Sequence, residues 1–246
     1  MPLSGTLINC ILVVSGSVAG LIFKKLMSER LKSSLLQAVS LIVMFVGIGG
    51  AVSAALTFEN GKFGTKDTLV MILSIVIGTV IGELINIEKR LDTFGAFCQR
   101  KLVKGNEKST FGEGLVTASL LFCVGAMAVV GSLDNGIRGD NSTLVAKGII
   151  DCITSMVLAS TLGIGVAFSA VPILIYQGAI SLLGVYIEPF LSAAIISQMS
   201  FTGSILIFAI GINVLGTTKI KVGNMLPAVF MPIVFDLLIK LWNMIA

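Results

Sequence analysis

Apolar runs long enough to cross a lipid bilayer recur along nearly the whole chain, and only short polar segments separate them. A helix needs about 20 residues to cross roughly 30 Å of hydrocarbon. On that measure the predicted spans are 5–23, 34–56, 68–87, 113–133, 144–163, 166–186, 201–216 and 222–243. We therefore expect an all-α membrane protein of about eight transmembrane helices, forming one polytopic membrane domain over residues 1–246.

The composition indicates that lipid is the natural solvent of the outer surface. Hydrophobic residues make up 55% of the chain and charged residues 12%, whereas a soluble domain carries about 25% charged residues. The mean hydropathy is +1.02. A large soluble protein with a buried core is disfavoured, because so apolar a chain would aggregate in water.

Residues 144–186 form one unbroken apolar stretch that is too long for a single helix. Gly163, Gly165 and Pro172 offer places at which the chain can turn. We favour a tight hairpin of two spans, and the alternative is one span followed by a re-entrant element.

Lysine and arginine are distributed unevenly between the predicted loops. The loops after the first, third and seventh spans are basic, whereas the other loops are poor in these residues. Basic loops belong in the cytoplasm. With eight spans the three basic loops share one side, and both termini are extracytoplasmic. Merging the fifth and sixth spans would move Lys219 and Lys221 to the opposite side, so eight spans are favoured.

Residues 88–111 are expected to link the two halves of the chain on the cytoplasmic side. Over residues 88–104, apolar residues at helical spacing alternate with lysines and arginines. This pattern is typical of an amphipathic helix that lies on the membrane surface. We expect the helix to anchor and space the two halves, and a regulatory or partner-binding role is the alternative.

A weak internal repeat emerges when residue 33 is placed on residue 197. Residues 33–48 then align without gaps with residues 197–212, and Gly47 meets Gly211. Spans one to three would correspond to spans six to eight, and the two copies would face opposite ways. Inverted repeats of this kind are typical of secondary transporters. The repeats would occupy residues 1–87 and 165–246, around a central helix pair at 112–164.

Ionisable residues inside the predicted spans are candidate functional groups, because inserting one costs about 2.5–3.5 kcal/mol. Asp151 lies within the fifth span, one turn after Lys147. It could bind a cation, a proton or a polar group of a substrate, or it could form a structural pair with Lys147. Glu83 and Asp236 lie near the ends of spans, where water can solvate them, and they occupy equivalent places in the repeat.

Several uncharged polar residues also lie within or beside the spans, among them Asn9, Gln177, Asn213 and Asn224. Asn224 precedes Pro227, and a proline leaves backbone carbonyls without their helical partners. Broken helices of this sort line the binding sites of transporters. Hydrogen bonding between helices is the alternative for each of these side chains.

Small residues recur at four-residue spacing in two of the predicted spans. Gly16 and Gly20 form one such pair, and Gly78 and Gly82 form another. Small residues at this spacing allow helices to approach closely in a membrane, so we expect these positions to serve packing rather than chemistry.

The chain contains no histidine. Its absence argues against zinc chemistry, haem with a histidine ligand, and Ser–His or Cys–His catalysis. The spans also lack a clustered set of acid and base groups. We therefore expect no enzyme activity, no catalytic residue, no metal site and no cofactor. The sequence has no G-x-x-x-x-G-K-[ST] pattern, which disfavours ATP-driven transport by this chain alone.

Distinctive motifs occur in the second half of the chain. They are LFCVGAMAVVGSLDNG at 121–136 followed by Gly139 and Asp140, GIGV at 163–166, YQG at 176–178 and KIKVGNMLPA at 219–228. Together they resemble the bacterial family named domain of unknown function 554, over essentially the whole chain. The resemblance implies an inner-membrane protein with a possible role in transport, and it carries over no catalytic residue. It directs attention to the polar positions Asp134, Asp140, Asp151, Gln177 and Asn224.

The leading hypothesis is a secondary transporter or facilitator of a small polar or ionic solute in the bacterial cytoplasmic membrane. Coupling to a cation or a proton through Asp151 would follow from it. An oligomeric ion channel and a non-catalytic membrane scaffold are the alternatives. The expected partners are the lipid bilayer, a small solute or ion and further copies of the chain, and no nucleic acid.

Overall fold

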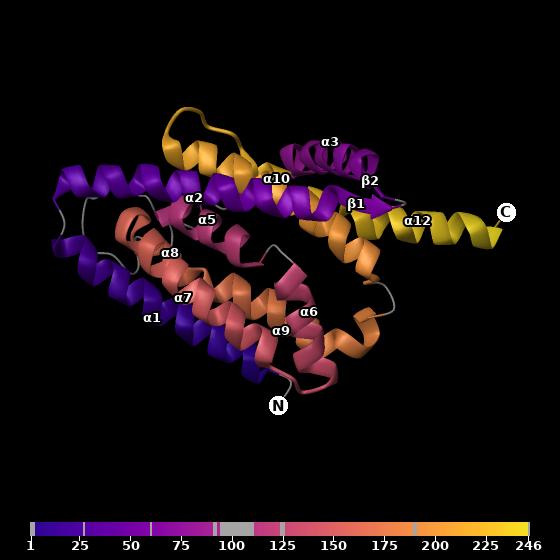
Figure 1. Ribbon diagram of the computed structural model, residues 1–246, viewed down its shortest axis with the longest axis horizontal. Helices are drawn as coiled ribbons and strands as arrows, with labels where there is room; N and C mark the ends of the chain where they lie inside the picture. The colour runs from indigo at the N-terminus through magenta and orange to yellow at the C-terminus, as the bar shows by residue number, and fades with distance from the viewer. Residues whose placement is uncertain are drawn as a thin grey trace.

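Long helices dominate the structure, a computed structural model that describes residues 3–26, 28–59, 61–90, 93, 111–123, 126–188 and 191–245. The first half contains α1 (Ser4–Leu26), α2 (Glu29–Ala55), β1 (Leu56–Glu59), β2 (Lys62–Thr65), α3 (Thr68–Ile85), α5 (Phe111–Cys123) and α6 (Ala126–Ile137). The second half contains α7 (Ser142–Leu162), α8 (Gly165–Phe168), α9 (Ala170–Ile187), α10 (Ala193–Leu215), α11 (Val222–Met225), the 3₁₀ turn η2 (Leu226–Phe230) and α12 (Met231–Ile245). Strands β1 and β2 form a small antiparallel hairpin between α2 and α3, and α12 projects from one end of the bundle (Figure 1).

The number of spans agrees with the sequence prediction. Within the described residues, seven helices are long and apolar enough to cross a membrane. The helices α5 and α6 meet at a bend of 62°, and counting this pair as one span brings the total to eight. Of the predicted surface helix at 88–104, residues 88–90 and 93 are helical, and the remainder lies outside the described residues.

One predicted boundary is wrong. The seventh span was expected to begin at residue 201, but α10 begins at Ala193. The preceding Ser192 caps this helix, because its hydroxyl oxygen accepts a hydrogen bond from the backbone N–H of Ile195 at 3.3 Å. A serine cap satisfies a backbone donor that would otherwise lack a helical partner, and so it favours a helix start at this point. The helix therefore includes the polar residues Ser197, Gln198 and Ser200, which precede the expected start.

The long apolar stretch at 144–186 folds as two helices, as the two-span prediction requires. Helix α7 ends at Leu162, and the capping Gly163 has a φ of +83° that glycine adopts without a side-chain penalty. Its N–H still donates to the carbonyl of Ala159 at 3.0 Å, which closes the last turn. The chain then continues through the short α8 into α9.

Helices α1 and α7 run in parallel. A methyl group placed on Gly5 would lie 2.8 Å from the Leu144 side chain, and one on Gly20 would lie 2.1 Å from the carbonyl oxygen of Met156. Short connections join α1 to α2 and α2 to α3, so α3 ends at the end of the bundle where α1 ends. Because α7 begins where α1 begins, the bent pair α5–α6 must carry the chain from one end of the bundle to the other.

Helices α2 and α10 form a close antiparallel contact along the long axis of the bundle (Figure 1). A methyl group on Gly47 would lie 2.5 Å from the backbone nitrogen of Phe208, and one on Gly211 would lie 2.8 Å from that of Met44. The hydroxyl of Ser40 donates to the carbonyl oxygen of Gly211 at 2.7 Å. Small residues therefore bring the two backbones together, as they do in other membrane proteins.

Replacing Gly47 with alanine should destabilise the protein by about 1–3 kcal/mol, because the methyl group would press on the backbone of α10. Gly49 provides a matched control in the same helix, since nothing lies within 4 Å of its substituent position. Gly49→Ala should leave stability unchanged or raise it slightly. Thermal unfolding of purified protein in detergent would measure both changes, and equal midpoints for the two variants would contradict the close contact.

Candidate functional site

A buried ion pair lies midway along α7. The ammonium group of Lys147 contacts the carboxylate of Asp151, four residues later. Both side chains are less than one-tenth exposed, with values of 8% for Lys147 and 7% for Asp151. Asp151 lies about 14 Å along the helix at 1.5 Å per residue, which is close to the middle of a hydrocarbon layer roughly 30 Å thick. Burying ionisable groups at this depth costs free energy, so the pair is a candidate functional site.

Side chains from three other helices surround the pair. Asn9 of α1 lies within hydrogen-bonding reach of Asp151. It also donates from Nδ2 to Oε1 of Gln177 on α9, at 3.3 Å. The ammonium nitrogen of Lys147 lies 5.8 Å from the ring centroid of Phe122 on α5, a distance at which the ring face attracts a cation. The sequence prediction therefore named two residues, Asp151 and Gln177, that belong to one network.

Two polar atoms of this network and one on the same helix as Asn9 have no hydrogen-bond partner among the described residues. They are Oγ1 of Thr6, Oδ1 of Asn9 and Nε2 of Gln177, and all three side chains are fully buried. Buried polar atoms in proteins nearly always have a partner. The network therefore offers both a donor and acceptors that a polar ligand could use.

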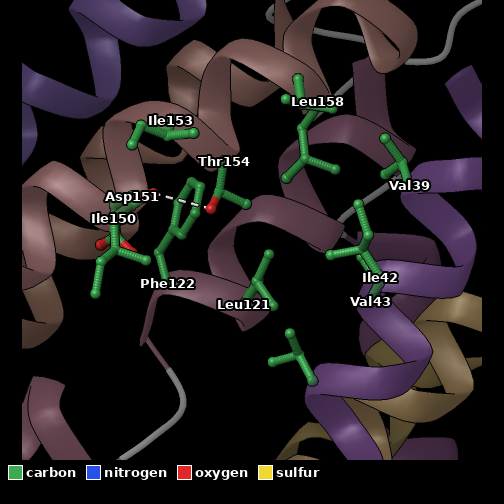
Figure 2. Close-up of a pocket in the computed structure, with 12 residues that line it drawn as sticks. Val39, Ile42, Val43, Leu121, Phe122, Ile150, Asp151, Ile153, Thr154 and Leu158 are labelled. Carbon is green, nitrogen blue, oxygen red and sulfur yellow. Dashed lines mark hydrogen bonds between the residues drawn. The ribbon is translucent and has the colours of Figure 1, made fainter.

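A cavity of about 290 Å³ reaches the ion pair from one side. Figure 2 shows that Val39 and Val43 of α2 lie across from Ile150 and Asp151 of α7, with Leu121 of α5 between them. The walls are apolar apart from Asp151 and Thr154. The Thr154 hydroxyl is already bonded to the carbonyl oxygen of Ile150 at 2.9 Å, so the Asp151 carboxylate is the ionisable group of the lining.

A second polar group joins the end of α3 to the broken segment at α11. Glu83 pairs with Lys221 at 2.5 Å and accepts a hydrogen bond from Nδ2 of Asn224. Asn224 Oδ1 accepts from the backbone N–H of Glu88, and Glu88 Oε2 accepts from the backbone N–H of Gly223, both at 2.7 Å. The Glu83 carboxylate raises the pKa of Lys221 above its ordinary value. We call these five residues the α3–α11 clasp.

Two of the predicted site residues instead hold local backbone structure. Asn213 donates to the carbonyl oxygen of Ile220 at 2.7 Å and accepts from the N–H of the same residue at 2.8 Å, which closes the loop after α10. Asp140 accepts from the backbone N–H of Ser142 at 2.9 Å, just before α7. This bond holds the pKa of Asp140 below its ordinary value.

The remaining two predicted residues form exposed pairs within single helices. Asp134 pairs with Arg138 at 2.9 Å in α6, and Asp236 pairs with Lys240 at 2.7 Å in α12. Glu83 and Asp236 were expected to occupy equivalent places, yet Glu83 pairs with Lys221 beside α11, whereas Asp236 pairs with Lys240 within α12. Neither Asp134 nor Asp236 is part of the network around Asp151.

Asn9 and Phe122 were absent from the predicted site residues. Asn9 lies on a polar stripe of α1 that also holds Thr6 and Ser17, all of them fully buried. The spacing of this stripe in an otherwise apolar helix was the available signal. No sequence signal distinguishes Phe122 from the other apolar residues of α5.

These features define a polytopic α-helical membrane protein with an ionic network in its helical core. Residues 4–237 match the model of the family described as Protein of unknown function (DUF554), and the chain belongs to this family. It is 35% identical over 228 residues to the Uncharacterized membrane protein YdfK of Bacillus subtilis (strain 168), with 93% of each chain covered. It is 29% identical over 230 residues to the Uncharacterized protein YqgA of Escherichia coli (strain K12), with 92% of this chain and 93% of the relative covered. No solved structure matches the chain. The family resemblance seen in the sequence is thereby confirmed.

Removing one member of the buried pair should be far more harmful than breaking an exposed pair. Asp151→Ala leaves the Lys147 charge buried without its partner, and we expect a loss of about 3 kcal/mol or more in the free energy of unfolding. Asp236→Ala breaks a pair with the same spacing in which Lys240 is 54% exposed, so its cost should be about 1 kcal/mol or less. Unfolding in detergent would compare them, and equal losses would contradict a buried, interacting pair.

Proposed function

We propose that this protein is a secondary transporter or facilitator of a small polar or ionic solute in the bacterial cytoplasmic membrane, and not an enzyme. In this proposal both termini are extracytoplasmic, which the distribution of basic loops supports. Two inverted repeats surround the buried network, and alternating access follows from their relative motion. The observation that carries the proposal is the reciprocal packing of Gly47 and Gly211 between α2 and α10, in a protein whose core also holds the buried Lys147–Asp151 pair.

Matching helix starts support the repeat. Ser28 caps α2 with its hydroxyl oxygen 3.3 Å from the backbone nitrogen of Leu31. Ser192 caps α10 in the same way, 3.3 Å from the nitrogen of Ile195. The two capping serines are 164 positions apart in the sequence, and so are Leu31 and Ile195. This is the same offset that places residue 33 on residue 197. The cap was not part of the aligned segment 33–48, so it is an independent agreement.

Reciprocal contacts at the α2–α10 crossing support it further. Gly47 approaches the backbone of Phe208, and Gly211 approaches the backbone of Met44. The same offset of 164 positions carries Gly47 to Gly211 and Met44 to Phe208. Each contact is therefore the image of the other, which is the pattern expected at a pseudo-two-fold axis.

The central helices divide between the repeats in a matching way. Helix α7 packs in parallel on α1, whereas α6 packs on α9, which corresponds to α1. On α6, the backbone carbonyl oxygen of Ser132 accepts a hydrogen bond from the hydroxyl of Ser181 at 2.9 Å. Gly136, also on α6, lies against the backbone of Ser181. Each half would thus contain three repeat helices and one central helix, with the buried pair carried by α7.

Solute flux in proteoliposomes would test the proposal directly. Osmotic reswelling, followed by light scattering, should be faster and saturable for at least one class of small polar or ionic solute in vesicles that contain the protein. Asp151→Asn should lower that flux by about tenfold or more, because it removes the charge at mid-membrane. Asp236→Asn provides the control and should retain flux. Permeabilities no higher than in protein-free vesicles across ions, amino acids and small acids would overturn the function.

Locking the α3–α11 clasp should stop transport, because Glu83 and Lys221 belong to different repeats. We expect that Glu83→Cys with Lys221→Cys, in a chain otherwise free of cysteine, loses flux after treatment with a short thiol cross-linker that a reductant can cleave. Reduction should restore the flux. The pair Asp236→Cys with Lys240→Cys lies within one helix and should keep flux when cross-linked. Full flux through the cross-linked clasp would contradict relative motion of the repeats there.

A further inference from the structure

We propose that the cavity beside Asp151 binds a small organic ammonium ion, whose charged group displaces Lys147 from the carboxylate. This deepens the proposed function, on which it rests, because it names the class of solute. The apolar walls of the cavity, the single carboxylate and the internal lysine define this class together.

The walls select for an apolar body. Val39, Val43, Leu121 and Leu158 come from α2, α5 and α7 and offer no hydrogen-bonding side chain. A bare inorganic ion would lose its hydration there without replacement, which is costly in an apolar environment. A volume of about 290 Å³ lies at the lower end of the usual range for small-molecule pockets, about 300–1,000 Å³. An alkyl or aryl group of a few carbon atoms suits these walls.

The carboxylate selects for an ammonium group. Asp151 is the ionisable residue of the lining, and its present partner is itself an alkylammonium, the side chain of Lys147. Lys147 therefore occupies the position that the charged end of the ligand would take. As a flexible four-carbon chain with three donors, the lysine can exchange its partner more readily than an arginine could.

The displaced Lys147 would retain partners. The face of Phe122 already lies 5.8 Å from its ammonium nitrogen. The Oδ1 atom of Asn9 is buried, has no partner among the described residues, and lies 3.5 Å from the substituent position of Gly148, the next residue on α7. These groups can share the charge of Lys147 while the ligand holds Asp151, which lowers the cost of a second cation in the site.

The cavity opens towards the lipid-facing surface between α2 and α7. Ile42, Ile150 and Ile153 line this side and are 55%, 55% and 58% exposed. Figure 2 places Ile42 on the α2 side of the cavity and Ile150 and Ile153 on the α7 side. The apolar body of the ion can rest on this side of the cavity while its ammonium group reaches Asp151 between the two helices.

Thermal unfolding of the full-length protein in detergent, titrated with n-butylammonium chloride, would test the site. A ligand that binds the folded state raises the unfolding midpoint in a saturable way. We expect this rise with the wild type and its loss in Asp151→Asn. The neutral analogue 1-butanol and sodium chloride at equal ionic strength should not reproduce it.

The competitor role of Lys147 gives a sharper expectation. Lys147→Gln should lower the half-saturating concentration of n-butylammonium by about tenfold or more, because close buried charge pairs couple strongly. Lys240→Gln removes the lysine of an exposed pair with the same spacing and should leave the value unchanged. Lys147→Arg keeps the charge and can form a two-pronged hydrogen bond with the carboxylate, so it should raise the half-saturating concentration of n-butylammonium. This variant tests the competition even if Lys147→Gln does not fold.

Each other outcome would overturn the inference. A rise that survives in Asp151→Asn, or an equal rise with sodium, would show that no organic ammonium site involves this carboxylate. A half-saturating concentration that is the same in the wild type and in the foldable Lys147 variants would remove the competition. The test measures binding in detergent and does not depend on transport, so the two proposals can fail separately. Binding of n-butylammonium without any solute flux would contradict the transport function alone. Flux of another solute without n-butylammonium binding would contradict this inference alone.

Discussion

Close approach between helix backbones is the interaction on which this structure depends. In a bilayer, apolar side chains gain nothing by leaving lipid for one another, so helices associate through tight packing and hydrogen bonds between them. Glycines supply that packing where α1 meets α7 and where α2 meets α10, with Gly20 and Gly47 set against the backbone of the partner helix. The large apolar side chains, such as Phe45 and Leu84, face outwards. Small residues let the helix backbones meet, and buried polar residues such as Asn9 and Gln177 lie beside the ion pair in a core that is otherwise largely apolar.

The network and the close contacts have different positions in the fold. The α2–α10 crossing lies at the proposed pseudo-symmetry axis and has the same character on both sides, with glycine against backbone in each direction. Among the described residues, the Lys147–Asp151 pair on α7 is the ion pair with both side chains buried, and the other pairs are partly exposed. In the proposed transporter, two inverted repeats around one buried carboxylate would present that carboxylate to each side of the membrane in turn.

Hydropathy predicts the number and the approximate positions of the spans, because the bilayer imposes a fixed length on each helix. The start of α10 was missed because the cap at Ser192 is a local hydrogen bond that hydropathy does not register. Asp151 and Gln177 could be named as candidates because a polar side chain is costly in lipid. Their meeting through Asn9 could not be predicted, because it depends on how α1 packs between α7 and α9. The cavity beside Asp151 likewise arises from the separation of α2 and α7, which no local pattern encodes.

The pairing of α1 with α7, and of α2 with α10, has a consequence for how the chain assembles. Domains form from the N-terminus during synthesis, yet the main partners of the first two helices are the later helices α7 and α10. Until α7 and α10 are synthesised, Gly20 and Gly47 therefore lack the backbone contacts that they make in the folded protein. A nascent chain stopped before α7 would lack the contacts of α1 with α7 and of α2 with α10, so misassembly would be most probable in that interval.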